Sequence, residues 1–420
     1  MDKFIVRGGN RLRGSIQISG AKNATLELMP AALLAPGTYS LRNTPNIRDV
    51  WTMSRLLGSM GIHAELNDGE LFLDTRNLTS QEAPYEHVKK MRASIHVLGP
   101  LVARYGYAKV SLPGGCAWGP RPIDLHLKGL ERLGAEIELD SGYIIARAER
   151  LKGTTITLDV SSVGATFNLM AAATLAEGKT IIVNAAMEPE VTAAGRFLQK
   201  MGAEIEGLGT SGITICGVTD LMPSDETTIP DRIETATLLA GVAMTGGEVT
   251  LQGTNPYHLS FIIERLEEAG CELDVNTNEI VLRAPDQLKP VSITTAIYPG
   301  FPTDMQAQWT AMMACAKGVS TITEKIYTDR FSHVPELARL GCDVEVHENR
   351  VIIKGGKSLK GATVMSTDLR GSVAMVLAGL IAEGETDVLR IYHLDRGYER
   401  LEDKLRSLGA DIVREKTEEF

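Results

Sequence analysis

Short runs of alternating apolar and polar residues recur along the chain, each directly after a helix-like segment that ends in glycine. The junction occurs six times, at Met60-Gly61-Ile62, Leu133-Gly134-Ala135, Met201-Gly202-Ala203, Ala269-Gly270-Cys271, Leu340-Gly341-Cys342 and Leu408-Gly409-Ala410. The intervals between successive glycines are 73, 68, 68, 71 and 68 residues. Such regularity indicates that one supersecondary unit is repeated six times.

Each repeat predicts a helix, a glycine in a left-handed conformation just after it, and a half-buried strand such as Glu136-Ile137-Glu138-Leu139. A short polar turn then leads into a second strand. The clearest turns are Asn67-Asp68-Gly69, Asp140-Ser141-Gly142 and Glu348-Asn349. The repeated unit is therefore of the βα type, and the chain belongs to the α/β class.

The two ends of the chain complete each other. The sixth repeat stops after its first strand, at Ala410 to Val413, while the segment Lys3 to Gly9 matches the second strand of the fifth repeat, Arg350 to Gly356. We expect the first strand to complete the last repeat, so that residues 1–20 join 230–420 in one domain and 21–229 form the other. The chain then crosses twice between domains of three repeats each, as suits a hinge. The alternative is one continuous α/β domain.

Composition narrows the class of protein. The 420 residues are 44% hydrophobic and 23% charged, and no apolar run approaches the roughly 20 residues of a membrane span. The N-terminus lacks the apolar region of a secretory signal, so we expect a cytoplasmic protein. A net charge of -10 argues against nonspecific nucleic-acid binding. Five scattered cysteines without a C-x-x-C pair make disulfides and structural zinc unexpected.

Polar segments precede a predicted helix in all six repeats. They are Ser19 to Asn23, Lys90 to Ser94, Ser162 to Thr166, Asp231 to Thr235, Pro302 to Gln306 and Ser366 to Arg370. Helix N-termini carry free N–H groups and partial positive charge. With Lys22, Arg92, Arg232 and Arg370 added, these segments predict an anion-binding cleft between the domains. Taken singly, each is also explained by helix capping.

Three further segments carry candidate chemistry. The glycine- and proline-rich loop of residues 112–126 holds Cys116 five residues before Arg121, which could lower the thiol pKa and make it an acid or nucleophile; the alternative is an inert loop cysteine. Asp304 stands at a helix start, as either a cap or a general base. Arg396, before the last helix, is either an anion ligand or part of a surface salt bridge.

Taken together, these segments resemble the UDP-N-acetylglucosamine 1-carboxyvinyltransferase family of enolpyruvyl transferases, nearly from end to end. The resemblance is carried by Ser19 to Asn23, Pro113 to His126, Pro230 to Thr235, Gly300 to Gln306, Asp368 to Arg370 and His393 to Arg400. It implies two inverse α/β domains of three βαβαββ repeats each (an α/β prism), with the cysteine loop in the second domain. It also implies transfer of the enolpyruvyl group of phosphoenolpyruvate to the 3′-hydroxyl of UDP-N-acetylglucosamine, by addition and elimination of phosphate, as the first committed step of peptidoglycan precursor synthesis.

The resemblance also implies roles for individual residues. Cys116 would be the proton donor and Asp304 the base, while Lys22, Arg121 and Arg396 would hold the phosphate and carboxylate of phosphoenolpyruvate, beside Asn23. The nucleotide-sugar site would comprise Asn23, Arg92, Arg121, Pro122, Ile123, Asp124, Leu125, Ser162, Val163, Gly164, Thr166, Asp304 and Ile326. Both ligands are small molecules, and no metal or organic cofactor is implied. Alkylation of Cys116 by fosfomycin is expected, and an aspartate at 116 should escape it.

Departures from the family pattern and rival readings remain. Trp118, Pro120 and Met187 and the Gly371-Ser372-Val373 stretch differ from the usual residues, and the first two leave the rate of loop closure open. Rival functions are the sister transferase acting on shikimate 3-phosphate, which lacks the loop cysteine, and a catalytically silent paralogue that binds the nucleotide sugar. An RNA-end-processing cyclase is a third, although neither a nucleophilic histidine nor a basic face is evident.

Overall fold

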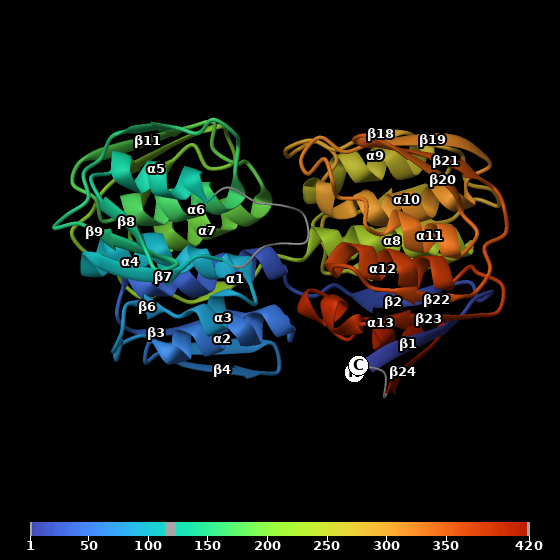
Figure 1. Ribbon diagram of the computed structural model, residues 1–420, viewed down its shortest axis with the longest axis horizontal. Helices are drawn as coiled ribbons and strands as arrows, with labels where there is room; N and C mark the ends of the chain where they lie inside the picture. Colours follow the sequence, from blue (N-terminus) through green and yellow to red (C-terminus); the bar gives the residue numbers. More distant parts are fainter. Residues whose placement is uncertain (1, 114–122, 418–420) are drawn as a thin grey trace. The chain divides into compact units, whose positions relative to one another are not determined.

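The computed structural model describes residues 2–113 and 123–417 and divides the chain into two compact units (Figure 1). Unit 1 comprises Met1–Ser19 and Pro230–Phe420, and unit 2 comprises Gly20–Ile229. Each unit has its own hydrophobic core. Within the described residues each unit contains three four-stranded sheets around central helices, which confirms the predicted α/β fold class.

The sheets of unit 2 share one plan: an edge strand, a strand parallel to it, and an antiparallel hairpin. Their orders are β14-β3-β5-β4, β6-β7-β9-β8 and β10-β11-β13-β12. The strands are β3 (Thr38–Arg42), β4 (His63–Asn67), β5 (Glu70–Asp74), β6 (Glu82–Ala83), β7 (Tyr107–Ser111), β8 (Glu136–Asp140), β9 (Tyr143–Arg147), β10 (Thr155–Thr157), β11 (Lys179–Val183), β12 (Glu204–Glu206), β13 (Gly212–Cys216) and β14 (Glu226–Thr227). In the sequence, β3 is the first strand of unit 2 and β14 the last, yet the two pair in one sheet. The three repeats of unit 2 therefore close into a ring.

Unit 1 repeats the plan in the orders β16-β17-β15-β2, β18-β19-β21-β20 and β22-β23-β1-β24. Its strands are β1 (Asp2–Arg7), β2 (Arg13–Gln17), β15 (Glu248–Gln252), β16 (Glu272–Val275), β17 (Glu279–Arg283), β18 (Ile293–Thr294), β19 (Gly318–Thr323), β20 (Asp343–His347), β21 (Arg350–Gly355), β22 (Thr363–Met365), β23 (Glu385–Leu389) and β24 (Asp411–Lys416).

The first strand occupies the place predicted for it. β1 lies between β23 and β24 and is antiparallel to both, with Val6 opposite Thr386 on one side and Ile412 on the other. It therefore replaces the hairpin strand that the sixth repeat lacks. Phe4 and Val6 are fully buried, so this strand belongs to the core of unit 1.

The helices of unit 2 are α1 (Lys22–Ala31), η1 (Ala32–Leu34), α2 (Arg48–Ser59), α3 (Tyr85–Val88), η2 (Arg92–Val97), α4 (Leu98–Tyr105), α5 (Asp124–Arg132), α6 (Val163–Ala173) and α7 (Pro189–Lys200). Those of unit 1 are α8 (Arg232–Thr245), η3 (Pro256–Leu259), α9 (Ser260–Glu268), η4 (Thr303–Met305), α10 (Gln306–Cys315), α11 (Val334–Arg339), α12 (Leu369–Gly379), η5 (Ile391–Arg396) and α13 (Leu401–Ser407). Helices α8, α10 and α12 contact one another and are apolar on nearly every side, as buried helices are.

The glycines that end the repeat helices have the predicted left-handed backbone conformation. Gly61, Gly134, Gly202, Gly270, Gly341 and Gly409 end the repeat helices with φ between 89° and 106°, which only glycine adopts readily. The hairpin turns carry positive φ at Asp68, Ser141 and Glu348. One detail differs: in the half-buried strand predicted at Glu136, which is the edge strand β8, Leu139 is 62% exposed.

Candidate active site

The polar segments that precede the helices do not all follow a strand directly. Lys22, Ser162, Asp231 and Asp368 stand at or next to helix starts that come soon after β2, β10, β14 and β22. In the second repeat, α3 intervenes between β6 and η2, which begins at Arg92. In the fifth, a loop of eight residues separates β18 from η4. The polar segments still begin helical turns in all six repeats.

In unit 1 the carboxylate of Asp304 is held between two arginines. Its Oδ1 accepts a hydrogen bond of 2.9 Å from Nη1 of Arg330, and its Oδ2 one of 3.0 Å from Nη2 of Arg370. The arginine side chains are 9% and 3% exposed, whereas that of Asp304 is 28% exposed. The carboxylate is therefore accessible from one side while the two cations are fixed behind it.

The charge of this carboxylate follows from its surroundings. Burial opposes ionisation, but Arg370 and Arg330 outweigh it and hold the pKa of Asp304 well below its usual range. The cap position of η4 is Pro302, and the two carboxylate oxygens of Asp304 bond to Arg330 and Arg370. The residue is an ionised acceptor with an arginine at each carboxylate oxygen.

Arg370 is placed by the start of α12. Asp368 caps that helix by accepting from the backbone N–H of Arg370 at 2.9 Å, and the guanidinium lies 5.4 Å from the ring centre of Tyr398. Tyr398 shares hydrogen bonds with Thr237 at 2.9 Å and Gln308 at 3.3 Å. This buried polar framework joins α8, α10, α12 and the segment that carries Arg396.

A second buried carboxylate organises the neighbouring loop. Glu324 accepts from the hydroxyls of Thr295 at 2.6 Å and Thr303 at 2.8 Å, and from the backbone N–H of Ile326 at 2.7 Å. Thr303 also receives a hydrogen bond of 3.0 Å from Arg330. Glu324 therefore connects the half-buried Ile326 to the turn that holds Asp304.

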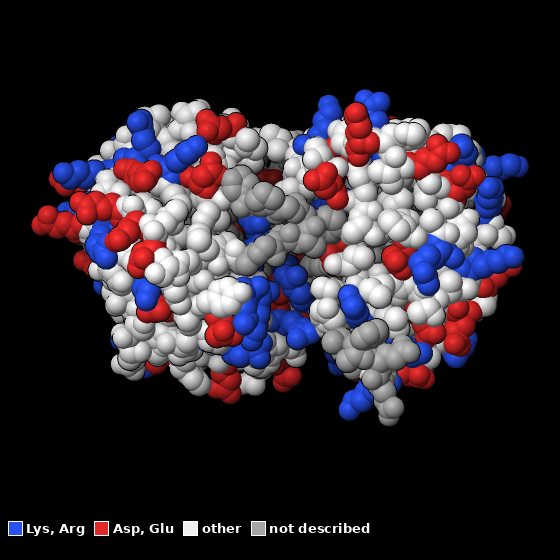
Figure 2. Space-filling view, in the orientation of Figure 1, with Lys and Arg blue, Asp and Glu red and all other residues white. Residues whose placement is uncertain are grey.

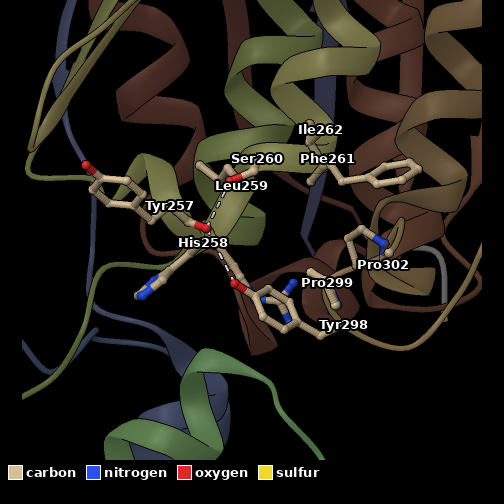
Figure 3. Close-up of a pocket in the computed structure, with 11 residues that line it drawn as sticks. Tyr257, His258, Leu259, Ser260, Phe261, Ile262, Tyr298, Pro299 and Pro302 are labelled. Atoms are coloured by element: carbon tan, nitrogen blue, oxygen red, sulfur yellow. Dashed lines mark hydrogen bonds between the residues drawn. The ribbon is translucent and has the colours of Figure 1, made fainter. Parts of the chain in front are cut away.

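A small pocket of about 20 Å³ opens beside this turn, between η3 with the start of α9 and residues 298–302 (Figure 3). The hydroxyl of Tyr298 donates to the carbonyl of Tyr257 at 3.4 Å, and Arg232 lies 5.6 Å from the ring centre of Tyr298. Pro302, on the pocket wall, precedes η4. The pocket brings Arg232, one of the basic residues singled out in the sequence, next to the segment of Asp304.

In unit 2, Lys22 is the first residue of α1 and is paired with Asp49 in the first turn of α2, with 3.0 Å between Nζ and Oδ2. The lysine side chain is 12% exposed and that of Asp49 only 3%. Asn23 follows on the same helix, and Arg92 begins η2, which contacts α1. The ion pair fixes the ammonium group at the start of α1.

Two histidines surround the start of α6. Asn168 accepts from the N–H of Gly99 at 2.8 Å, so its amide nitrogen faces Nδ1 of His126 at 2.8 Å and donates to it. His126 is then neutral with its proton on Nε2. Burial, followed by the charges of His96 and Arg92, lowers the pKa of His126 to about 3. A methyl group at Gly164 would lie 3.1 Å from Nε2 of His96, so an alanine here would have to push this ring back by a few tenths of an ångström.

The remaining candidates of unit 2 differ in accessibility. Ser162 caps α6 by accepting from the N–H of Ala165, and Val163 is half-buried. Thr166 is fully buried and its hydroxyl accepts from the N–H of Ala186 at 2.9 Å, which makes it part of the core packing. At the start of α5, Ile123 and Leu125 pack on the core, and Asp124 pairs with Lys128 at 3.3 Å.

Cys116, Arg121 and Pro122, together with Trp118 and Pro120, lie outside the described residues. Asp304, Ile326 and Arg396 belong to unit 1, and Lys22, Asn23, Arg92, Ile123 to Leu125 and Ser162 to Thr166 belong to unit 2. Arg396 ends η5, two residues before Tyr398. Within unit 1, Asp304 and Ile326 are connected through Thr303 and Glu324.

Sequence reasoning missed several residues that hold the site together. Arg330, Glu324 and Asp49 stand in segments without a recognisable motif, and only the fold brings them to Asp304 and Lys22. Asn168 lies inside a helix that reads as apolar. Each could have been noticed as a polar residue within an otherwise apolar or irregular segment, but its partner could not.

Among the described residues, no group of His, Cys, Asp or Glu is arranged to hold a metal ion, and no helix is long and apolar enough to cross a membrane. On the face seen in Figure 2, both signs of charge occur on each of the two units. Cross-strand pairs such as Arg147 with Glu138 and Arg283 with Glu248 are examples.

Solved structures define the class of protein. NikO, an enolpyruvyl transferase from Streptomyces tendae, superposes with a TM-score of 0.90 at 27% identity, covering 99% of both chains. EPSP synthase from Acinetobacter baumannii gives 0.77 at 20% identity, covering 99% of this chain and all of the other. The protein therefore has the enolpyruvyl transferase fold.

Sequence relatives narrow the class further. A family model described as EPSP synthase (3-phosphoshikimate 1-carboxyvinyltransferase) matches residues 6–405. Relatives named UDP-N-acetylglucosamine 1-carboxyvinyltransferase, from Chlorobium limicola and Prosthecochloris aestuarii, are 54% and 52% identical over the full length of both chains. The chain belongs to the enolpyruvyl transferase family of enzymes, in the branch whose members carry that name.

Proposed function

We propose that this enzyme transfers the enolpyruvyl group of phosphoenolpyruvate to the 3′-hydroxyl of UDP-N-acetylglucosamine and releases inorganic phosphate. The observation that carries the proposal is the identity of 51–54% over the whole chain with relatives named for this reaction. It follows that the enzyme acts at the first committed step of peptidoglycan precursor synthesis, in the cytoplasm, with effects on cell shape and division.

The reaction needs an acid and a base at defined atoms. Cys116 gives its thiol proton to the methylene carbon of phosphoenolpyruvate while the sugar 3′-oxygen bonds to the adjacent carbon, and Asp304 takes the hydroxyl proton. In the second stage the methyl carbon returns a proton to Cys116. The carbon–oxygen bond to phosphate then breaks, and phosphate leaves with the proton held by Asp304.

The low pKa of Asp304 sets the timing of its step. An aspartate between two guanidinium groups is a weak base toward a free alcohol, so the proton moves only as the bond to carbon forms and the hydroxyl becomes acidic. Arg330 and Arg370 also orient the carboxylate, which leaves its exposed side for the 3′-hydroxyl. Preorganisation of this kind lowers the barrier without moving charge at the moment of reaction.

In this proposal, cationic side chains bind the anionic groups of phosphoenolpyruvate. Lys22, held by Asp49, and Arg396 act with Arg121 on the phosphate and carboxylate of phosphoenolpyruvate, with Asn23 beside them. In this proposal the nucleotide sugar contacts Asn23, Arg92, residues 121–125, Ser162 to Gly164, Thr166, Asp304 and Ile326. Because the hydroxyl of Thr166 is engaged by Ala186, that residue shapes the site through the start of α6.

Phosphate release tests the proposal. We expect release from phosphoenolpyruvate to require UDP-N-acetylglucosamine and to be lost in Cys116→Ala. Shikimate 3-phosphate in place of the nucleotide sugar should give no release. Release with shikimate 3-phosphate alone would reassign the enzyme to the sister reaction, and absence of release with either acceptor would favour a silent nucleotide-sugar-binding protein.

A further inference from the structure

The segment that carries Arg396 has little stability of its own. It is the six-residue 3₁₀ helix η5, which is preceded by Arg390 at φ 57°, and Arg400 at φ 44° precedes the next helix, α13. Short 3₁₀ helices have poor hydrogen-bond geometry, and the left-handed conformation of Arg390 at the start of η5 adds strain. The direction of the Arg396 side chain therefore depends on tertiary contacts that hold this turn.

One such contact comes from the last strand of the chain. Arg414 in β24 stands opposite Phe4 of β1, and its guanidinium lies 4.9 Å from the centre of that ring. From there it reaches Asp395 with two hydrogen bonds, Nη2 to Oδ1 at 2.7 Å and Nη1 to Oδ2 at 3.0 Å. Paired bonds of this kind fix the orientation of a carboxylate as well as its distance.

Two further carboxylates contact the guanidinium group of Arg414. Its Nε donates to Glu402 of α13 at 2.7 Å, and Nη1 lies 3.4 Å from Asp2. Burial opposes the charge, but the hydrogen bonds to Asp395 and Glu402 outweigh it and raise the pKa of Arg414. At 28% exposure this side chain is screened less than an ordinary surface pair.

The contact adjoins Arg396 directly. Asp395 is the preceding residue, and on the other side Tyr398 is tied to Thr237 and Gln308. Tertiary hydrogen bonds therefore hold the chain on both sides of Arg396, at Asp395 and at Tyr398. Only those of Tyr398 belong to the polar framework around Arg370. The hydrogen bonds between Asp395 and Arg414 connect this segment to strand β24.

We propose that Arg414, through Asp395, is a positioning residue that aims Arg396 at phosphoenolpyruvate. The inference rests on the proposed function, and in particular on the anion-binding role of Arg396. Arg414 lies in no segment that carries the family resemblance. Its planar fork, rather than its charge alone, is what the geometry requires.

Steady-state kinetics with both substrates test this inference. Arg414→Lys keeps the charge and loses the fork, Arg414→Met loses both, and Asp395→Asn removes the ionic partner. We expect KM for phosphoenolpyruvate to rise about threefold in the lysine variant and about tenfold in the other two, the latter a change of about 1.4 kcal/mol. KM for UDP-N-acetylglucosamine should stay within twofold. The double variant Asp395→Asn, Arg414→Met should resemble either single one.

A matched control separates positioning from general stability. Arg283 in β17 likewise bridges two carboxylates, Glu248 at 2.9 Å and Asp274 at 2.8 Å, on an exposed sheet face. Arg283→Lys should leave both KM values unchanged. If Arg414→Lys behaves like this control, or if both substrates lose affinity equally, the positioning role is overturned. If the native enzyme releases no phosphate, the proposed function itself fails, so the two failures are distinguishable.

Discussion

At the scale of single residues, the site depends on which groups are charged. Asp304 is ionised because two buried arginines hydrogen-bond to it, and His126 is neutral because Asn168 donates a hydrogen bond to its Nδ1. Neither state follows from the residue type alone. Both follow from partners distant in the sequence.

Replacement of Asp304 by asparagine should lower kcat by about 10²-fold, because the proton acceptor is lost while the shape is kept. It should also destabilise unit 1, since Arg330 and Arg370 lose their counter-charge. Because the pKa of Asp304 is lowered in the folded state, its stabilising effect is complete above the unfolded pKa of about 4 and is lost as pH falls further. Denaturant unfolding from pH 2 to 7 measures this. An equal difference between native and variant proteins at every pH would contradict the argument.

Thiol reactivity should separate the cysteines. Burial raises the pKa of Cys271, Cys315 and Cys342 to about 12, so these thiols should resist alkylation of the folded protein at pH 7. Fosfomycin should label Cys116, and Cys116→Asp should escape both labelling and inhibition. Peptide mass spectrometry identifies the modified residue, with exposed Cys216 as an internal reference for accessible thiols. Labelling of Cys271, Cys315 and Cys342 at a rate comparable to that of Cys216 would contradict the raised pKa values of these thiols.

At the scale of elements, the start of α6 depends on close approach. Gly164→Ala would bring a methyl group to 3.1 Å from His96 and 3.3 Å from His126, so we expect KM for UDP-N-acetylglucosamine to rise about tenfold as the start of the helix shifts. Gly58→Ala is the matched control, because nothing lies within 4 Å of its added methyl group in α2. Alanine at position 58 should slightly raise the free energy of unfolding and leave both KM values unchanged. Equal kinetics in the two variants would argue against a ligand at α6.

The elements were also the part of the fold most readily predicted. Glycines with positive φ and polar hairpin turns are local features, so the sequence alone located the repeats and their strands. Asp304 and Arg370 could be named as candidates because they begin helices. Arg330 and Arg414 could not, since their roles arise from a loop and an end strand whose partners are set by tertiary packing.

At the scale of the whole molecule, the first strand determines whether unit 1 is complete. Val6 is fully buried in β1, between β23 and β24, so Val6→Ala should cost about 2 kcal/mol of unfolding free energy. Val413→Ala in the adjacent β24 is the control, because that side chain is 41% exposed and should cost little. Chemical denaturation compares the two. Similar losses would contradict the claim that Val6 contributes to the core of unit 1.

The central claim is the reaction itself, and the product tests it most directly. The native enzyme, incubated with phosphoenolpyruvate and UDP-N-acetylglucosamine, should form a nucleotide sugar heavier by one enolpyruvyl group, one-for-one with phosphate, as seen by mass spectrometry. Substitution of the 3′-hydroxyl by hydrogen in the acceptor should abolish it. A nucleotide sugar recovered unchanged, with phosphoenolpyruvate intact, would contradict the account.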